Sequence, residues 1–290
     1  MSYTALLLIV LAAFIHATWN LLAKRAAHAG PAFVFYYSAI ASLAYLPWAV
    51  WLVLDGALTL SLPVLLCVVA SGVLHLAYSL FLQRGYQVAD LSVVYPIARG
   101  TGPMLSTIGA FLLLGESPTT YGLLGLIAIV AGIILISTQG NLAKFLQPEA
   151  ITGVRWGTVT GGAIAGYTVV DAYGVKVLGI HPVILDWCSN TMRVITLLPW
   201  MMRNLHVAHE RMRKHWWLAI AVGVLSPMSY ILVLLALRMG APLSLTAPAR
   251  EMSMMVGALF GMFILREKVG PGRLLGCAIL IAGVILLGMA

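Results

Sequence analysis

Charged residues are scarce in this sequence. Only 9% of its 290 residues are charged, whereas 61% are hydrophobic and the mean hydropathy is +0.99. A soluble domain carries roughly a quarter of its residues as charged side chains, so this chain could not cover a globule with a hydrated surface. We therefore expect an integral membrane protein. The net charge of +8 is interpreted as a signal of membrane orientation rather than of nucleic-acid binding.

Signatures of nucleotide and metal chemistry are also absent from the sequence. There is no GxxxxGK[ST] phosphate loop, no HExxH motif and no polar stretch long enough for a nucleotide-binding domain. The three cysteines, Cys67, Cys188 and Cys277, lie inside apolar segments at a spacing that fits no metal site. We predict no cofactor, no bound metal and no ATP bound to this chain.

Ten segments are apolar over the roughly 20 residues that a membrane helix needs. The first lacks a basic start and a small-residue cleavage site, so it is predicted as a membrane helix rather than a signal peptide. The breaks between segments are too short to hold a soluble domain. The predicted fold is an all-α integral membrane protein whose spans cover about 3–22, 31–54, 62–83, 89–114, 118–137, 156–176, 181–202, 216–237, 242–265 and 270–289.

The two halves of the chain resemble each other at an offset of 151–152 residues. In that comparison Pro96 meets Pro248, Arg99 meets Arg250, and the stretch after Glu116 meets the stretch after Glu267. Five is odd, so a second five-helix copy enters the membrane from the opposite side. We therefore predict two inverted repeats, 1–140 and 156–290, joined by a loop at 141–155 into one transport unit. Secondary transporters with this plan bind substrate near the midplane, between the repeats.

This organisation resembles the EamA-type branch of the drug/metabolite transporter superfamily. The resemblance covers almost the whole chain. It rests on the glycine-rich fifth and tenth spans (LLGLIAIVAGIILI and LLGCAILIAGVILL), an acidic residue just before each of them, and HATWN at residues 16–20. It implies a multi-pass transporter of the cell inner (plasma) membrane and not an enzyme. Characterised members mostly move amino acids, other small metabolites or vitamins, many of them as exporters.

The distribution of lysine and arginine predicts the orientation of the chain. The odd-numbered connections hold twelve of these residues and the even-numbered connections hold two, Lys176 and Arg238. Because basic loops stay in the cytoplasm, the count puts both termini outside. Members of the family are usually described with cytoplasmic termini, and we follow the count because it comes from this sequence.

Arg99 and Arg250 are the principal candidates for binding substrate. Each lies near the middle of its span, and each follows a proline, which removes an amide donor and loosens the helix. Two guanidinium groups facing one cavity repel each other unless an anion or an acidic side chain lies between them. Since arginine binds a carboxylate with two hydrogen bonds, we expect a carboxylate-bearing or zwitterionic substrate; internal partners such as Asp171 are the alternative.

Further polar residues are expected around this pair. His16, Trp19 and Asn20 share one face of the first span. The remaining candidates are Tyr95, which could stack on a substrate together with Trp19, and the counterparts of His16 and Asn20 in the second repeat, Tyr167 and Asp171.

Two acidic residues, Glu251 and Asp171, are candidates for carrying a coupling proton, with fixed ion pairs as the alternative. Glu251 follows Arg250 directly. On a continuous helix the two side chains would point about 100° apart, so we expect them not to converge on one point.

Several other polar residues are interpreted first as structural. His75 is expected to be satisfied by neighbours within the bundle. Hydrogen bonds along one face of the seventh span are expected to link its polar residues. Glu116 and Glu267 are expected to be junction residues. Before the fifth span, Ser117 is expected to cap the helix and Pro118 to start it. The seventh-span residues are Asp186, Asn190 and Arg193.

The sequence thus predicts a secondary-active exporter of a small polar metabolite that works by alternating access. An amino-acid-like compound would fit, as would an amino-acid-derived metal chelator. One alternative is an uptake transporter for a vitamin or an anionic nutrient, and another is an intramembrane enzyme acting on lipid headgroups. The expected partners are the small-molecule substrate, the lipid bilayer and a proton, with no nucleic acid.

Overall fold

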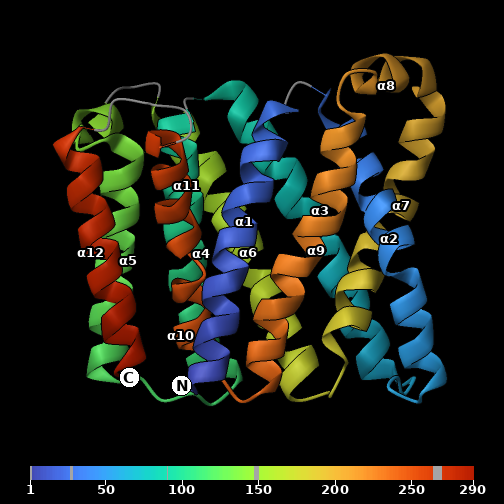
Figure 1. Cartoon of the computed structure of the whole chain (residues 1–290), viewed down its shortest axis with the longest axis horizontal. Helices are drawn as coiled ribbons and strands as arrows, with labels where there is room; N and C mark the ends of the chain where they lie inside the picture. The colour runs from blue at the N-terminus through green and yellow to red at the C-terminus, as the bar shows by residue number, and fades with distance from the viewer. Residues whose placement is uncertain (1, 27–28, 90, 147–149, 264–269) are drawn as a thin grey trace.

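A computed structural model describes residues 2–26, 29–89, 91–146, 150–263 and 270–290, and every described element is helical (Figure 1). Glu267, and the basic residues Arg266 and Lys268 that enter the charge count, lie outside these ranges. The first half contains α1 Tyr3–Arg25, α2 Pro31–Leu54, α3 Leu62–Val88, α4 Leu91–Leu113 and α5 Thr120–Thr138. After the short 3-10 helix η2 Leu142–Leu146, the second half contains α6 Ala150–Lys176, α7 Pro182–Arg203, α8 Leu205–Met212, α9 Trp216–Arg238, α10 Leu243–Ala249, α11 Met252–Phe263 and α12 Pro271–Gly288.

The ten predicted spans are recovered, with differences in where several of them begin, end or break. The ninth span is divided into α10 and α11, the short helix α8 occupies the connection between the seventh and eighth spans, and α6 begins at Ala150 rather than at residue 156. Among the described helices, α1, α2, α3, α5 and α9 are long and apolar enough by themselves to cross a membrane. The helices α4, α6 and α7 are more polar because they carry buried charged residues.

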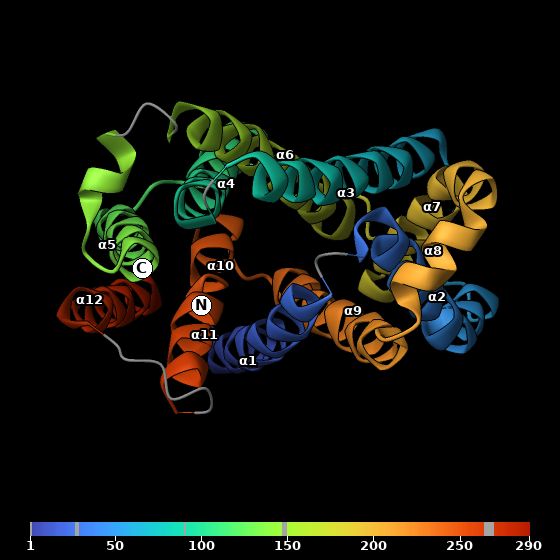
Figure 2. The same cartoon turned by 90° about the horizontal axis from the view of Figure 1, so that it is seen from above.

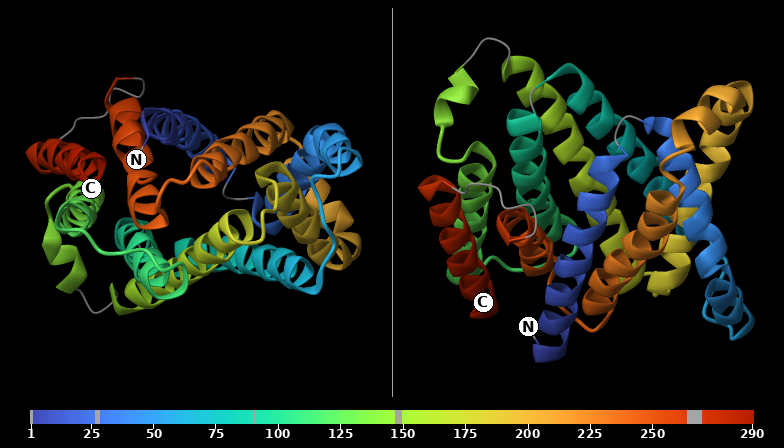
Figure 3. Two further views of the ribbon diagram at one scale, coloured as in Figure 1. Left: turned by 90° about the horizontal axis from the view of Figure 1, so that it is seen from below. Right: turned by 45° about the horizontal axis from the view of Figure 1, so that its top comes forward.

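The helices of the two halves are interleaved rather than stacked as separate bodies. Seen from above, α3, α4 and α6 line one long side of the molecule and α1, α9 and α11 line the other (Figure 2). At one end α5 packs along α12, and at the opposite end α2 packs along α7. Both termini lie at the same face, away from α8 (Figures 1 and 3). A chain that crosses the membrane an even number of times must have both ends on the same side.

Glycines allow the closest helix contacts, as is common in membrane bundles. A Cβ atom on Gly132 of α5 would lie 2.8 Å from the backbone oxygen of Gly276 on α12, and one on Gly125 would lie 2.8 Å from that of Gly283. The glycine-rich fifth and tenth spans therefore form one tightly packed pair.

The start of α5 differs from the expectation. The helix begins at Thr120, and Thr119 is its N-cap, because the Thr119 side chain accepts a hydrogen bond of 3.0 Å from the Gly122 amide. Ser117 and Pro118 precede this cap and belong to the connection from α4. A threonine oxygen satisfies one of the free amides of a first turn in the same way as serine.

Candidate functional site

The division between α10 and α11 falls at Arg250 and Glu251. Pro248 has no amide hydrogen, so the carbonyl of Ser244 four residues earlier has no partner within the helix; it accepts a hydrogen bond of 3.5 Å from the Thr107 hydroxyl of α4 instead. The next turn is tight, because the Glu251 amide bonds to the carbonyl of Pro248 at 3.0 Å. The helix is therefore interrupted at the two charged residues.

Glu251 lies between the two candidate arginines. Its Oε2 is 2.6 Å from Arg99 Nε, and its Oε1 is 3.8 Å from Arg250 Nε. All three side chains are buried. The expectation that Arg250 and Glu251 would not converge is wrong, since it assumed a continuous helix and the helix is interrupted between them. The buried carboxylate that faces Arg99 is Glu251 and not Asp171, the partner that the sequence suggested.

The ion pairs of Glu251 lack directed hydrogen bonds. Neither of its carboxylate oxygens, nor Arg99 Nε or Arg250 Nε, makes an aligned hydrogen bond with any residue that the structure describes. Arg99 is also held by a hydrogen bond of 3.0 Å to the Ser253 hydroxyl, and it lies 3.4 Å from the His16 ring nitrogen. Arg250 instead lies over the Tyr167 ring, 5.9 Å from its centre. Arg250 is thus the less firmly engaged of the two arginines.

Asp171 forms a second buried cluster beside the first. Its Oδ2 accepts a hydrogen bond of 2.5 Å from the Tyr230 hydroxyl and lies 2.9 Å from His75 Nε2. Its Oδ1 has no hydrogen-bond partner among the described residues. The Tyr167 ring stacks on His75 with centres 4.0 Å apart, so Tyr167 connects this cluster to Arg250. The expectation that His75 is satisfied inside the bundle is confirmed.

The polar face of α1 borders the arginine cluster. His16 and Trp19 meet edge to face at 4.8 Å, and the Trp19 ring donates a hydrogen bond of 3.1 Å to the Ser229 hydroxyl of α9. Asn20 donates to the carbonyl of His16 in its own helix at 2.9 Å. The Tyr95 ring centre lies 6.0 Å from the Arg99 guanidinium. His16 and Tyr95 are therefore next to Arg99, whereas the Asn20 amide bonds within its own helix.

The polar residues of α7 form hydrogen bonds within their own helix and to α2. Asn190 donates to the Asp186 carboxylate at 2.9 Å, as the spacing predicts, but Arg193 donates to the Tyr37 hydroxyl of α2 at 3.3 Å. The expected chain along this face is therefore only half formed among the described residues: Asp186 and Asn190 are linked, and Arg193 bonds to a second helix instead.

Sequence reasoning did not identify Tyr230 and Ser253 as members of the site, and it did not name His75 as the partner of Asp171. The repeat comparison contained one usable signal, because it pairs Tyr78 with Tyr230. In the structure both of these rings contact Tyr167, at 5.6 and 5.9 Å between ring centres. A hydroxyl or a histidine elsewhere on an apolar helix gives no comparable signal.

A bundle of interleaved inverted halves, with an interrupted helix and buried charges at the centre, defines a membrane transport protein of the inverted-repeat class. The profile of the EamA-like transporter family matches residues 3–138 and again residues 151–289. The chain belongs to this family, whose members are membrane transporters of the drug/metabolite type, and it is a multi-pass membrane protein.

The chain also resembles individual proteins. It is 34% identical over 64 residues to the multidrug resistance protein EbrB of Bacillus atrophaeus, a match that covers 22% of this chain and 55% of that protein. The chain therefore spans about half the length of this relative. A protein of known crystal structure superposes with a TM-score of 0.78 at 14% identity, over 100% of this chain and 99% of the other. That likeness shows the fold alone.

Proposed function

We propose that this protein is a secondary-active exporter, in the inner membrane, of a small carboxylate-bearing or zwitterionic metabolite. One observation carries the proposal: Glu251, a buried carboxylate, lies between two buried guanidinium groups but is not held by aligned hydrogen bonds. A structural Arg–carboxylate pair normally uses two directed hydrogen bonds. A carboxylate held mainly by its charge can be displaced by a carboxylate of the substrate.

Arg250 is the arginine that takes the substrate carboxylate. It is 3.8 Å from Glu251, and its Nε makes no hydrogen bond with the described residues. Arg99 remains with Glu251, Ser253 and His16. On the far side of Tyr167, the buried Oδ1 of Asp171, which has no hydrogen-bond partner among the described residues, accepts an ammonium or hydroxyl group of the substrate. This division of roles supports a zwitterionic compound, such as an amino acid or an amino-acid-derived metal chelator.

Coupling to a proton follows because the substrate carboxylate and Glu251 compete for Arg250. When the substrate carboxylate occupies Arg250, Glu251 loses part of its compensating charge, and a buried carboxylate with less compensation binds a proton more readily. Substrate and proton would then occupy the site in a linked order. Alternating access around this central site completes the cycle.

Flux through reconstituted liposomes tests the proposal. Amino acids, dicarboxylates, phosphonates and chelators are offered in both directions, with and without a pH gradient, together with an amide analogue of each compound that moves. We expect Arg250→Gln to lower the transport of carboxylates relative to their amides by roughly tenfold to a hundredfold, since hydrogen bonds to charged groups contribute about 1.5–3 kcal/mol each. The exposed Arg238 on α9 supplies the control Arg238→Gln, for which no change is expected.

Two results would overturn the proposal. The first is undiminished carboxylate transport by Arg250→Gln, or an equal loss for carboxylates and amides. The second is formation of a chemical product without net flux, which would favour an intramembrane enzyme. Net inward accumulation driven by an imposed gradient would support the uptake transporter in place of the exporter.

A further inference from the structure

Glu116 joins three separate segments at the face that carries the termini. It lies in the connection between α4 and α5. Its Oε1 accepts hydrogen bonds from the Leu243 amide at 2.7 Å and from Lys176 Nζ at 3.0 Å, and its Oε2 accepts one from the Ser244 amide at 2.8 Å. Lys176, the last residue of α6, also donates to the carbonyl of Ala241 at 3.2 Å. One carboxylate of the first half thereby holds the first turn of α10 in the second half.

These contacts differ from those of Glu251. Both oxygens of Glu116 accept aligned hydrogen bonds, two of them from backbone amides, and its side chain is only 11% exposed. Burial alone would raise the pKa of Glu116, but the amides of Ser244 and Leu243 and the ammonium group of Lys176 hold that pKa below its ordinary value. Glu116 is therefore charged and tightly bound in this conformation.

The half-helix held by Glu116 leads directly to the arginine site. Every residue of α10 is buried, and the helix packs against α4 and α5 and ends immediately before Arg250. In Figure 1, α10 lies between α11 and the face with the termini. A displacement of its first turn would therefore move Arg250 and uncover the site at this face.

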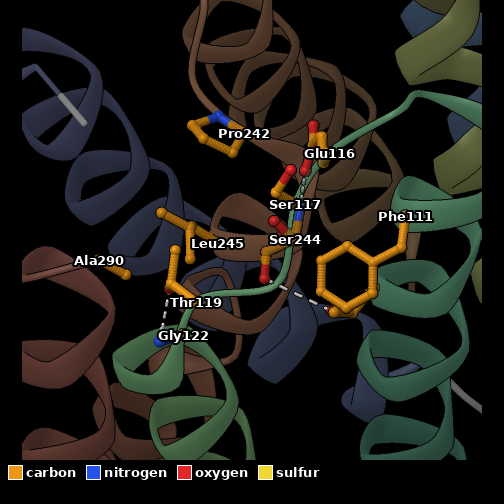
Figure 4. Close-up of a pocket in the computed structure, with 10 residues that line it drawn as sticks. Phe111, Glu116, Ser117, Thr119, Gly122, Pro242, Ser244, Leu245 and Ala290 are labelled. Carbon is orange, nitrogen blue, oxygen red and sulfur yellow. Dashed lines mark hydrogen bonds between the residues drawn. The ribbon is translucent and has the colours of Figure 1, made fainter.

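A cavity lies beside this first turn. Its volume is about 220 Å³, and Glu116, Ser244 and Pro242 line it together with Phe111 and Leu245. Figure 4 shows Glu116 and Ser244 among the residues that line it. Space next to a charged contact lets water reach the contact and lets α10 move without a clash.

We propose that Glu116 is a latch for transport, a positioning residue that holds α10 in place and keeps the path to Arg250 closed at the face with the termini. Release of its bonds to Leu243, Ser244 and Lys176 frees α10 and opens this end. The inference rests on the proposed transport function, because a latch has a role only where the two ends open in turn.

The accessibility of an introduced cysteine tests the latch without any substrate. Ser244→Cys is made in a background with Cys67→Ala and Cys188→Ala, and a membrane-impermeant maleimide is applied to proteoliposomes from each side. We expect Glu116→Gln to raise the labelling rate from the side of the termini by roughly tenfold, the effect on an opening equilibrium of losing about one hydrogen bond to a charged group. Lys176→Gln, which keeps both amide bonds, should raise it less.

Two internal controls separate a latch from general damage. Glu210→Gln alters an acid on α8 whose side chain is 68% exposed, and it should leave the rate unchanged. The native Cys277 of α12 is 8% exposed and belongs to an apolar cluster that includes residues of α5. It should stay unreactive in every variant when its peptide is followed by mass spectrometry. An unchanged rate in Glu116→Gln would overturn the latch, and so would an equal rise at Cys277. A failed flux experiment would leave this result unaffected, so the two proposals are tested separately.

Discussion

At the scale of single residues, Glu251 is a buried carboxylate that lies between two buried guanidinium groups, whose charges it compensates. Removing one member of a buried ion pair leaves an uncompensated charge, and such a change costs about 3–5 kcal/mol, whereas removing both members costs much less. The stability of the bundle and the binding of an anion therefore depend on the same three side chains.

We predict that Glu251→Gln lowers the free energy of unfolding by about 3–5 kcal/mol. The double variant Arg99→Gln with Glu251→Gln should lose less than the sum of the two single variants, by about 0.5–3 kcal/mol. Unfolding of all three variants in detergent micelles measures this. Additive losses would show that Arg99 and Glu251 do not interact in the folded protein.

The residue types of the site could be predicted from the sequence, but their pairing could not. Arg99, Arg250, Asp171 and Glu251 stand out because ionisable residues are rare inside apolar spans. Which carboxylate meets which arginine depends on where a helix ends. On an uninterrupted helix the side chains of Arg250 and Glu251 would point apart. The helix is interrupted at these two residues, and their side chains lie together.

At the scale of the helix, two matching sequences adopt different shapes. Proline precedes the arginine in both spans, yet α4 is a single helix and its counterpart is divided into α10 and α11. The reason lies in the neighbouring helix. A row of small residues on α6 receives α4, and a Cβ on Gly157 or Gly161 would lie closer than 3.0 Å to Ile97 or Thr101. Such close contact with α6 keeps α4 helical despite its prolines. The hydropathy of the sequence does not reveal this contact.

The contact between α5 and α12 gives a prediction at this scale. Gly132→Ala would place a Cβ 2.8 Å from the backbone oxygen of Gly276. Because backbone cannot rotate away, we expect a loss of about 1–3 kcal/mol, as for other overpacked sites. Gly162→Ala on α6 is the matched control, because a Cβ there meets nothing within 4 Å and alanine favours the helix by about 1 kcal/mol. Thermal unfolding of both variants in one detergent measures the difference, and equal melting temperatures would contradict it.

At the scale of the whole molecule, the orientation in the membrane is a further prediction. The structure places α8 at the face opposite the termini (Figure 1), and its connection holds Arg203, Arg211, Arg213 and Lys214. This is in keeping with the twelve-to-two count of basic residues in the connections. We expect both termini outside. A C-terminal alkaline phosphatase fusion should be active and a C-terminal green fluorescent protein fusion dark in an intact cell. The reverse pattern would show that the charge count does not set the orientation of this chain.

The sequence predicted the ten crossings and the inverted relation of the halves, since both follow from hydropathy and internal similarity. It did not predict that the two copies would differ in shape. The difference extends to their packing: α4 lies along much of α6, while the equivalent contact of α11 with α1 is less extensive. Local sequence cannot report this, because matching segments have matching propensities.

The chain thus contains one sequence pattern in two forms, an uninterrupted helix in α4 and a divided one in α10 and α11. Each copy shows the shape that the other would need in a state open at the opposite end. If α4 were interrupted at Arg99 while α10 and α11 joined into one helix, the two halves would exchange conformations, and a half-turn about an axis in the membrane plane would relate the new state to the present one. The state open at the opposite end would then require only that the two halves exchange conformations.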